Sequence, residues 1–237
     1  MKTLLVIHSS PKSSQSVTRD LTADFVEKWL ANNPEGTVVN RDVGLNPPPH
    51  LTEETIGAFY TPAEQRTEAQ NTALAVSDEL IAELRTADEV VIASPMHNFT
   101  ITSGLKTWVD QVARVGETFQ YTENGPEGLL KDRPVYVITA SGGDYRAHTP
   151  IAFLNHQDTY LKVALNFVGL QDIRLVQAAG VAAGGRCRRR GEHRRSLPGV
   201  CRRSGAGRGH DRKGQRADPA VAARYPLPGR PGHLRQR

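Results

Sequence analysis

Short apolar runs alternate with longer stretches of helical periodicity along the first 180 residues of the chain. The run from Leu4 to Ile7 is continuously apolar, which is typical of a parallel strand buried on both faces. Four further short segments rich in apolar residues predict strands at residues 37–43, 89–93, 134–139 and 172–177. The pattern therefore indicates a sheet whose two faces are both covered.

The segments between these strands carry apolar residues three and four positions apart, the spacing of amphipathic helices. They predict helices over residues 17–32, 52–60, 62–85, 105–112 and 154–168. We expect the third helix to open at Thr61 and to bury a face formed by Leu74, Ser77, Leu80, Ile81 and Leu84. Residues 122–128 are expected to form an excursion at the surface.

Five strands that alternate with helices predict an α/β fold with a doubly wound parallel sheet. We expect the flavodoxin-like strand order 2-1-3-4-5, in which the first and third strands are neighbours. The loops after those strands, residues 9–16 and 94–99, should then flank a crevice at the carboxyl edge of the sheet. Such a fold needs a last helix after the fifth strand, and the sequence predicts none there.

Charge divides the chain near residue 185. Residues 1–185 contain 14 Lys and Arg against 22 Asp and Glu, whereas residues 186–237 contain 16 against 3. Gly and Pro occur throughout the second part, and no apolar residue recurs there at helical spacing. We therefore expect a globular domain over residues 1–185 and a disordered basic tail over residues 186–237.

Cysteine content and apolar run length bear on the cellular compartment. Cys187 and Cys201 both lie in the basic tail, so the globular part has no disulfide framework. The first apolar run is too short for a signal peptide, and no run reaches the roughly 20 apolar residues that cross a bilayer. We expect a cytoplasmic protein with no membrane partner.

The loop after the first strand has the chemistry of an anion site. Hydroxyl and amide side chains precede a predicted helix, at Ser10, Ser14, Gln15 and Ser16. Together with the free N–H groups of a helix N-terminus they could hold a phosphate. Because neither a Gly-x-Gly-x-x-Gly nor a Gly-Lys-Ser/Thr motif is present, a terminal monophosphate fits better than a dinucleotide or a P-loop ligand. Alternatively, these residues serve only as turn and cap residues.

Two further loops offer groups suited to a flat, partly polar ring. Met96, Asn98 and Phe99 follow the third strand and could present apolar surface and an amide. Gly142 and Gly143 follow the fourth strand, where their N–H groups could stabilise negative charge on a ring. By itself His97 is interpreted as a solvated loop residue. The other histidines lack the spacing of ligands, so no metal site is expected.

Four motifs in residues 1–180 resemble the FMN-dependent NADH:azoreductases, a family of flavodoxin-like NAD(P)H:quinone oxidoreductases. They lie at residues 14–16, 93–99, 118–128 and 139–143, and the segment YTENGPEG at 121–128 is the most specific. The chain departs from the family at His97, where Tyr is frequent, and at Ala140, where Ser is common.

The resemblance implies a cofactor, FMN, and a set of residues that bind it. The FMN phosphate would be bound by Ser10, Ser14, Gln15 and Ser16. The edge of the flavin ring would be lined by Pro95, Met96, His97, Asn98 and Phe99. Its pyrimidine end would lie near Ala140, Ser141, Gly142, Gly143 and Tyr145. The family is homodimeric, and the substrate pocket completed by the other subunit would include Phe119, Tyr121 and Phe167.

The resemblance also implies the activity. NADH or NADPH would reduce the flavin and leave, and a quinone or azo compound would then be reduced in the same place, a ping-pong mechanism. Since the redox chemistry belongs to the cofactor, no catalytic residue beyond the flavin is expected.

Two alternatives remain open because of the tail. Its arginines could bind nucleic acid without sequence specificity, through counterion release. The chain could also be an inactive remnant, destabilised by the lack of a last helix. Family members end in an amphipathic helix after the fifth strand, so the abrupt basic sequence from Arg186 suggests a frameshift between about residues 180 and 186. Translating the gene in its other forward frames tests that hypothesis.

Overall fold

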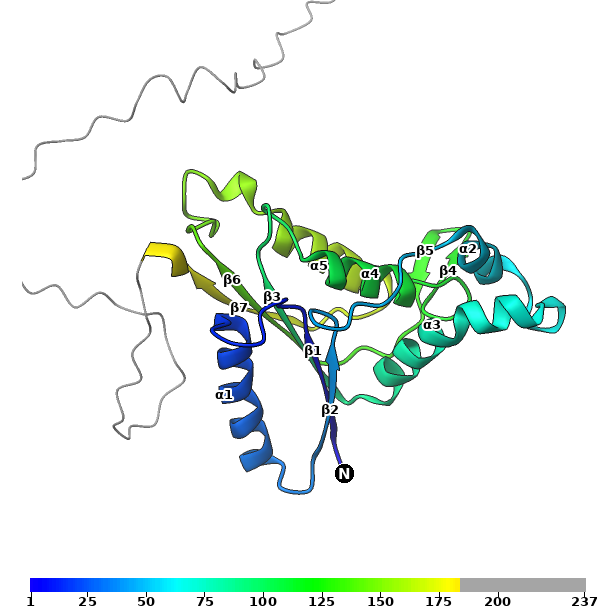
Figure 1. Ribbon diagram of the computed structural model, residues 1–237, viewed down its shortest axis with the longest axis horizontal. Helices are drawn as coiled ribbons and strands as arrows, with labels where there is room; N and C mark the ends of the chain where they lie inside the picture. Colours follow the sequence, from blue (N-terminus) through cyan, green and yellow to red (C-terminus); the bar gives the residue numbers. More distant parts are fainter. Residues whose placement is uncertain (184–237) are drawn as a thin grey trace, which may run out of the picture. The chain divides into compact units, whose positions relative to one another are not determined.

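A five-stranded parallel sheet forms the centre of the computed structural model, which describes residues 1–183 (Figure 1). Its strands are β1 (Thr3–His8), β2 (Thr37–Asp42), β3 (Glu89–Pro95), β6 (Val135–Ser141) and β7 (Ile173–Ala179). They lie in the order β2-β1-β3-β6-β7, and every neighbouring pair is parallel. The predicted flavodoxin-like order of five strands is confirmed.

Helices cover both faces of the sheet. On one face α1 (Val17–Asn32) packs Trp29 against Leu4 and Val6. The other face is covered by α3 (Glu68–Thr86), α4 (Ser103–Val112) and α5 (His156–Phe167), as Figure 1 shows. The shorter α2 (Glu53–Tyr60) packs on α3, and single 3-10 turns form η1 (Ala63–Gln65), η2 (Ala152–Leu154) and η3 (Val181–Ala183).

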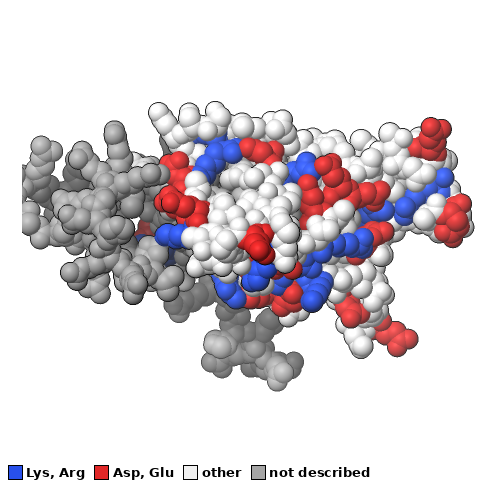
Figure 2. All heavy atoms as spheres, turned by 90° about the horizontal axis from the view of Figure 1, so that it is seen from below, with Lys and Arg blue, Asp and Glu red and all other residues white. Residues whose placement is uncertain are grey.

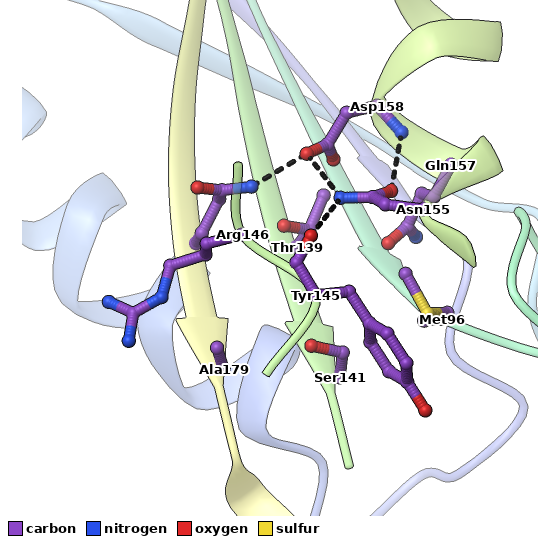
Figure 3. A pocket seen from close by; sticks show the side chains of 10 residues that line it. Met96, Thr139, Ser141, Tyr145, Arg146, Asn155, Gln157, Asp158 and Ala179 are labelled. Atoms are coloured by element: carbon purple, nitrogen blue, oxygen red, sulfur yellow. Dashed lines mark hydrogen bonds between the residues drawn. The ribbon is translucent and has the colours of Figure 1, made fainter. Parts of the chain in front are cut away.

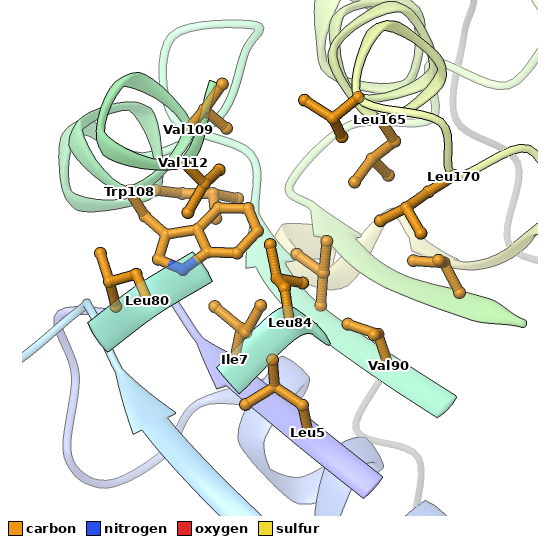
Figure 4. Packing of buried hydrophobic residues seen from close by; sticks show 14 of the residues in the cluster. Leu5, Ile7, Leu80, Leu84, Val90, Trp108, Val109, Val112, Leu165 and Leu170 are labelled. Atoms are coloured by element: carbon orange, nitrogen blue, oxygen red, sulfur yellow. The ribbon is translucent and has the colours of Figure 1, made fainter. Parts of the chain in front are cut away.

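The alternation of side chains along β1 explains its continuous apolar run. Leu5 and Ile7 point into the larger core, where they meet Leu84 of α3 and Trp108 of α4 (Figure 4). Their neighbours along the strand point to the opposite face, under α1. Burying each such Leu or Ile contributes about 1.5–3 kcal/mol, so the two cores together hold the sheet between its helices.

The structure confirms the buried face of α3 and corrects the position at which this helix begins. All five residues of the predicted stripe are buried, Leu74, Ser77, Leu80, Ile81 and Leu84. The helix, however, begins after Thr67, not after Thr61. Thr67 and Gln70 form a reciprocal capping box, which satisfies two backbone N–H groups at once, while η1 occupies the intervening turn.

Residues 119–128 form a hairpin that the sequence did not predict. Strand β4 (Phe119–Thr122) pairs antiparallel with β5 (Gly125–Gly128), and Thr122 lies opposite Gly125. Gly125 closes the turn with a φ of 108°, which glycine adopts without strain. The segment lies at the surface as expected, with Tyr121 68% exposed, but it is paired and not irregular.

The face of β7 on the α1 side is covered by no described helix. Val176 is 45% exposed there, and the guanidinium of Arg174 lies over the Tyr136 ring at 5.3 Å from its centre. The expected lack of a last helix, the disordered tail, the frameshift and the domain boundary at residue 185 all concern residues 184–237. These predictions lie outside the described part of the chain.

Candidate active site

Three loops meet at the carboxyl edge of the sheet. Residues 9–16 follow β1, residues 96–102 follow β3 and residues 142–155 follow β6. The register brings their starting points together, because His8 pairs with Ala93 and Pro95 pairs with Ala140. The parallel sheet thus brings three of the motifs found in the sequence to one edge, where open α/β sheets bind ligands.

The loop after β1 is fixed to the neighbouring strand. Ser9 is fully buried and donates a hydrogen bond from Oγ to the carbonyl oxygen of Ala93, at 3.0 Å. Ser10 is also buried, and its Oγ accepts from the Lys12 N–H. Ser14 and Gln15 are exposed, and Gln15 has a φ of 56°. The loop therefore has a rigid base and polar side chains at its open side.

The N-terminus of α1 differs from that of the other helices in residues 1–183. The side chains of Thr52, Thr67, Thr102 and Asn155 cap α2, α3, α4 and α5. Ser16 occupies the equivalent position of α1, but its side chain accepts no hydrogen bond from a backbone N–H of the first turn; its Oγ pairs with the Thr18 hydroxyl at 3.3 Å. Unsatisfied N–H groups at a helix start attract anions, so this end of α1 suits a phosphate.

A strained turn follows β3. The backbone N–H groups of His97 and Thr100 each donate to the other residue's carbonyl oxygen, at 2.9 and 3.0 Å. Asn98 and Phe99 fill the two central positions with φ values of 47° and 72°. A type I′ turn requires such values, which Asn tolerates and Phe rarely adopts, at a cost of order 1–3 kcal/mol.

The Phe99 ring occupies this costly position beside the loop after β6. It is 42% exposed and meets Tyr145 edge to face, with ring centres 5.9 Å apart. The turn is anchored on both sides, because Met96 N–H donates to Ala140 and His156 N–H donates to Phe99. Strain retained at such an anchored turn is characteristic of functional sites. His97 is exposed, as expected from the sequence.

Backbone N–H groups are available after β6. The carbonyl oxygens of Gly142 and Gly143 accept from the N–H groups of Ala182 and Gly180, at 3.3 and 3.1 Å. Neither glycine N–H donates to another described residue. A Cβ atom on Gly143 would lie 2.9 Å from the Tyr145 ring, so a larger residue there would displace that ring. The pair can therefore donate two hydrogen bonds to a ligand.

An ion pair stiffens the same loop. Arg146 donates to both carboxylate oxygens of Asp144, from Nε at 2.8 Å and from Nη2 at 2.6 Å. The Arg146 side-chain hydrogen bonds lower the pKa of Asp144 to about 2. Since the two charges neutralise each other, the loop adds little net charge to the crevice.

A small pocket lies between the carboxyl end of β6 and the start of α5 (Figure 3). Asp158 lies in its wall and accepts hydrogen bonds from Asn155 Nδ2 at 2.8 Å and Gln177 Nε2 at 2.6 Å. Its other oxygen, Oδ1, is buried and has no partner among the described residues. Met96 and Tyr145 also line this pocket, so it adjoins the strained turn.

Four polar residues of this pocket were not predicted from the sequence, Asn155, Gln157, Asp158 and Gln177. Asn155 caps α5 through a hydrogen bond from the Asp158 N–H, and polar residues before a helix are ordinarily caps. No spacing in the sequence marks Gln177, which reaches the pocket only through the pairing of β6 with β7. Across residues 1–183, no three His, Cys, Asp or Glu side chains are arranged to hold a metal ion.

Phe119, Tyr121 and Phe167 form a separate group. Phe119 lies 4.4 Å from the Phe167 ring and 5.5 Å from the Tyr121 ring, measured between centres. Phe167 ends α5, whereas the crevice lies at the start of this 12-residue helix, about 18 Å away along its axis. The structure brings the three aromatic residues together. The hairpin β4–β5, which carries two of them, lies away from the loop that joins β1 to α1 (Figure 1).

Comparisons with known proteins identify the family of this chain. A family model described as the flavodoxin-like fold matches residues 2–196. The FMN-dependent NADH:quinone oxidoreductase of Herminiimonas arsenicoxydans is 46% identical over 184 residues, which cover 78% of this chain and 90% of that protein. The protein of the same name from Azotobacter vinelandii is 46% identical over 191 residues, covering 81% and 94%.

A solved structure agrees with these relatives. It is an FMN-dependent NADH-azoreductase from Bacillus anthracis in complex with FMN, which superposes with a TM-score of 0.69 at 32% identity. The superposition covers 77% of this chain and 89% of the azoreductase. The chain therefore belongs to the flavodoxin-like family of the FMN-dependent NADH:quinone oxidoreductases.

Proposed function

We propose that this protein is an FMN-dependent oxidoreductase that takes electrons from NADH or NADPH and reduces quinones or azo compounds. The observation that carries the proposal is the convergence of three elements at one sheet edge. These are the uncapped start of α1, the strained turn at residues 97–100 and the free N–H groups of Gly142 and Gly143. The names of the relatives and of the superposed azoreductase support it.

The first loop would hold the phosphate of FMN. The N–H groups at the start of α1 supply donors without a side-chain competitor, and the hydroxyl and amide groups come from Ser10, Ser14, Gln15 and Ser16. A phosphate held by backbone dipoles and hydroxyl groups needs no arginine in direct contact.

The second and third loops would hold the flavin ring. Its edge would lie against Pro95, Met96, His97, Asn98 and Phe99, and Tyr145 would support Phe99 from the side. The N–H groups of Gly142 and Gly143, next to Ala140 and Ser141, would donate to the pyrimidine end. When bound, FMN accepts a hydride from the nicotinamide and passes two electrons to the acceptor in ping-pong order. The protein binds, orients and shields these partners.

A second copy of the chain would complete the substrate pocket. Tyr121 projects from the hairpin with 68% of its surface exposed, and it packs on Phe119, which in turn packs on Phe167 at the far end of α5 from the crevice. In a homodimer these rings would close the other subunit's crevice. Light scattering of the purified protein should therefore give twice the chain mass, and Y121A should raise KM for a quinone without releasing FMN.

Colour is the primary test of the proposed function. The purified protein should be yellow, or become yellow on adding FMN, and NADH should bleach it in the absence of oxygen. As a sharper test, G143A should weaken FMN binding because its Cβ would lie 2.9 Å from the Tyr145 ring. A colourless protein that takes up no FMN would show the proposal to be wrong and would favour an inactive remnant.

Nonspecific nucleic-acid binding is a second candidate, supported by the 16 Lys and Arg against 3 Asp and Glu in residues 186–237. On the drawn face of the described part, Lys and Arg are interspersed with Asp and Glu (Figure 2). Because residues 1–185 contain 14 Lys and Arg against 22 Asp and Glu, we expect any such binding to come from the tail. It should fall steeply with salt and disappear when residues 186–237 are removed, whereas FMN binding should remain.

None of the described helices is both long and apolar enough to cross a membrane.

A further inference from the structure

Arg19 connects the loop after β1 to the end of β2. Its Nε donates to the Lys12 carbonyl oxygen at 2.8 Å, and its Nη2 donates to the Ser10 carbonyl oxygen at 2.7 Å. The same guanidinium pairs with both carboxylate oxygens of Asp42, at 2.7 and 3.0 Å. Each guanidinium nitrogen thus has a protein oxygen as its partner, which holds the Arg19 side chain against the loop and the end of β2.

This network controls the direction of the loop carbonyls. An anion site must present N–H and hydroxyl groups, because carbonyl oxygens repel negative charge. Arg19 attracts the carbonyl oxygens of Ser10 and Lys12 to itself. In a planar trans peptide the N–H points opposite to the carbonyl, so the N–H of Ser13 faces away from the guanidinium. The contact thereby fixes which side of the loop carries donors.

Asp42 fixes the other end of the network. Its Oδ1 also accepts from the backbone N–H groups of Gly44 and Leu45, at 3.1 and 3.0 Å. Burial alone would raise the pKa of Asp42, but the Arg19 and backbone hydrogen bonds outweigh it and hold the pKa below its usual value. A Cβ on Gly44 would lie 2.2 Å from the Ser10 carbonyl oxygen, so the two loops touch through their backbones.

The position of Arg19 in α1 is unfavourable for a cation. It lies in the first turn of the helix, where the helix dipole disfavours a cation. Only 17% of its side chain and 25% of that of Asp42 are exposed. An arginine at this place therefore gains from the loop contacts and not from helix stability.

We infer that Arg19 and Asp42 are positioning residues that set the phosphate-binding geometry of residues 9–16, and hence the preference for a phosphorylated flavin over riboflavin. The inference rests on the proposed function, because it assumes that this loop holds the FMN phosphate. It assigns to the ion pair an effect on the phosphate alone, since neither residue belongs to the loops proposed to hold the flavin ring.

Riboflavin, which is FMN without its phosphate, separates loop geometry from general stability. The dissociation constants of FMN and riboflavin are measured for the full-length protein and for R19Q, R19K and D42N. We expect R19Q and D42N to weaken FMN binding about tenfold and to leave riboflavin binding unchanged. The dissociation constant of riboflavin divided by that of FMN should therefore fall about tenfold. R19K keeps the charge but cannot bridge two carbonyls and a carboxylate, so it should lie between R19Q and the wild type.

A matched control comes from the adjacent residue of β2. Arg41 forms a comparable ion pair with Glu79 and Glu83 of α3, away from the loop. R41Q should therefore leave the ratio of the two dissociation constants unchanged. D42N keeps an oxygen for the Gly44 and Leu45 N–H groups, so it decides the matter if R19Q fails to fold.

The outcomes separate this inference from the proposed function. If the wild type prefers FMN and both R19Q and D42N keep that preference, the positioning role is wrong. Equal weakening of FMN and riboflavin would also overturn it, because that result indicates a general loss of structure. If the wild type binds FMN no more tightly than riboflavin, the proposed phosphate site itself is wrong.

Discussion

Gln157 donates two hydrogen bonds from Nε2 to Ser94, one to its carbonyl oxygen and one to its Oγ, each 3.0 Å long. Both residues are buried, with 1% and 0% of their surface exposed. Gln157 lies in the first turn of α5 and Ser94 lies near the end of β3, one residue before Pro95. The pair therefore ties α5 to the strand that leads into the strained turn.

Replacing Gln157 by Leu should destabilise the protein and loosen this turn. The substitution removes two hydrogen bonds to buried oxygens of Ser94, which costs about 1–3 kcal/mol of unfolding free energy. We expect denaturant unfolding to show that loss and FMN titration to show weaker binding. Q111L is the matched control, because Gln111 is equally buried and donates to Pro49 on another part of the fold. Equal effects of Q157L and Q111L on FMN affinity would contradict the assignment.

The F99G variant of the protein should be more stable than the F99A variant. Its φ of 72° is costly for any side chain and free for glycine, so F99G should exceed F99A in unfolding free energy by about 1 kcal/mol. At an ordinary position the order is reversed. Both variants lose the ring that meets Tyr145, so both should bind FMN less tightly. A lower stability of F99G than of F99A would show that the turn is not strained.

The sheet and its helices could be predicted because their signals are local. Short segments rich in apolar residues mark the five strands, and the spacing from Leu74 to Leu84 marks the buried face of α3. The predicted start of α3 was wrong because Thr61 and Thr67 are both residue types that cap helices. Only the reciprocal bonds between Thr67 and Gln70 distinguish them, and these form when the helix does.

The candidate site was predictable where one loop carries the chemistry, and not where distant segments meet. Residues 94–99 and the glycine pair each stand out in the sequence. By contrast, Gln157 reaches Ser94 across 63 positions, and Arg19 reaches Asp42 across 23. No pattern in the sequence indicates either contact, because each depends on how the strands align. The hairpin at 119–128 was not predicted because its strands have only four residues each.

The unfolding free energy of the protein should fall in mild acid because of His8. Burial, with a further contribution from Arg19, lowers the pKa of His8 below 6.5. The folded state therefore disfavours the charged imidazole, so its contribution to stability is present above pH 6.5 and is lost as pH falls through the folded pKa. One proton limits the effect to about 1.4 kcal/mol per pH unit.

Unfolding free energies measured from pH 8 to pH 5 test this prediction. H8Q should show a shallower decline than the wild type over that range. H50Q serves as the control, because His50 is exposed and its replacement should leave the decline unchanged. A wild-type curve that is flat below pH 6.5 would contradict a buried neutral His8.

A shortened chain that ends at residue 185 should bind FMN as tightly as the full chain. The five strands of the parallel sheet and the three loops of the crevice lie within residues 1–183, so the shortened chain keeps the groups proposed to contact FMN. The control is a chain that ends at residue 196, where the family match ends. If residues 1–185 bind FMN weakly while residues 1–196 bind it normally, segment 186–196 belongs to the folded domain. The expected domain boundary at residue 185 would then be wrong, although the phosphate and ring sites would stand.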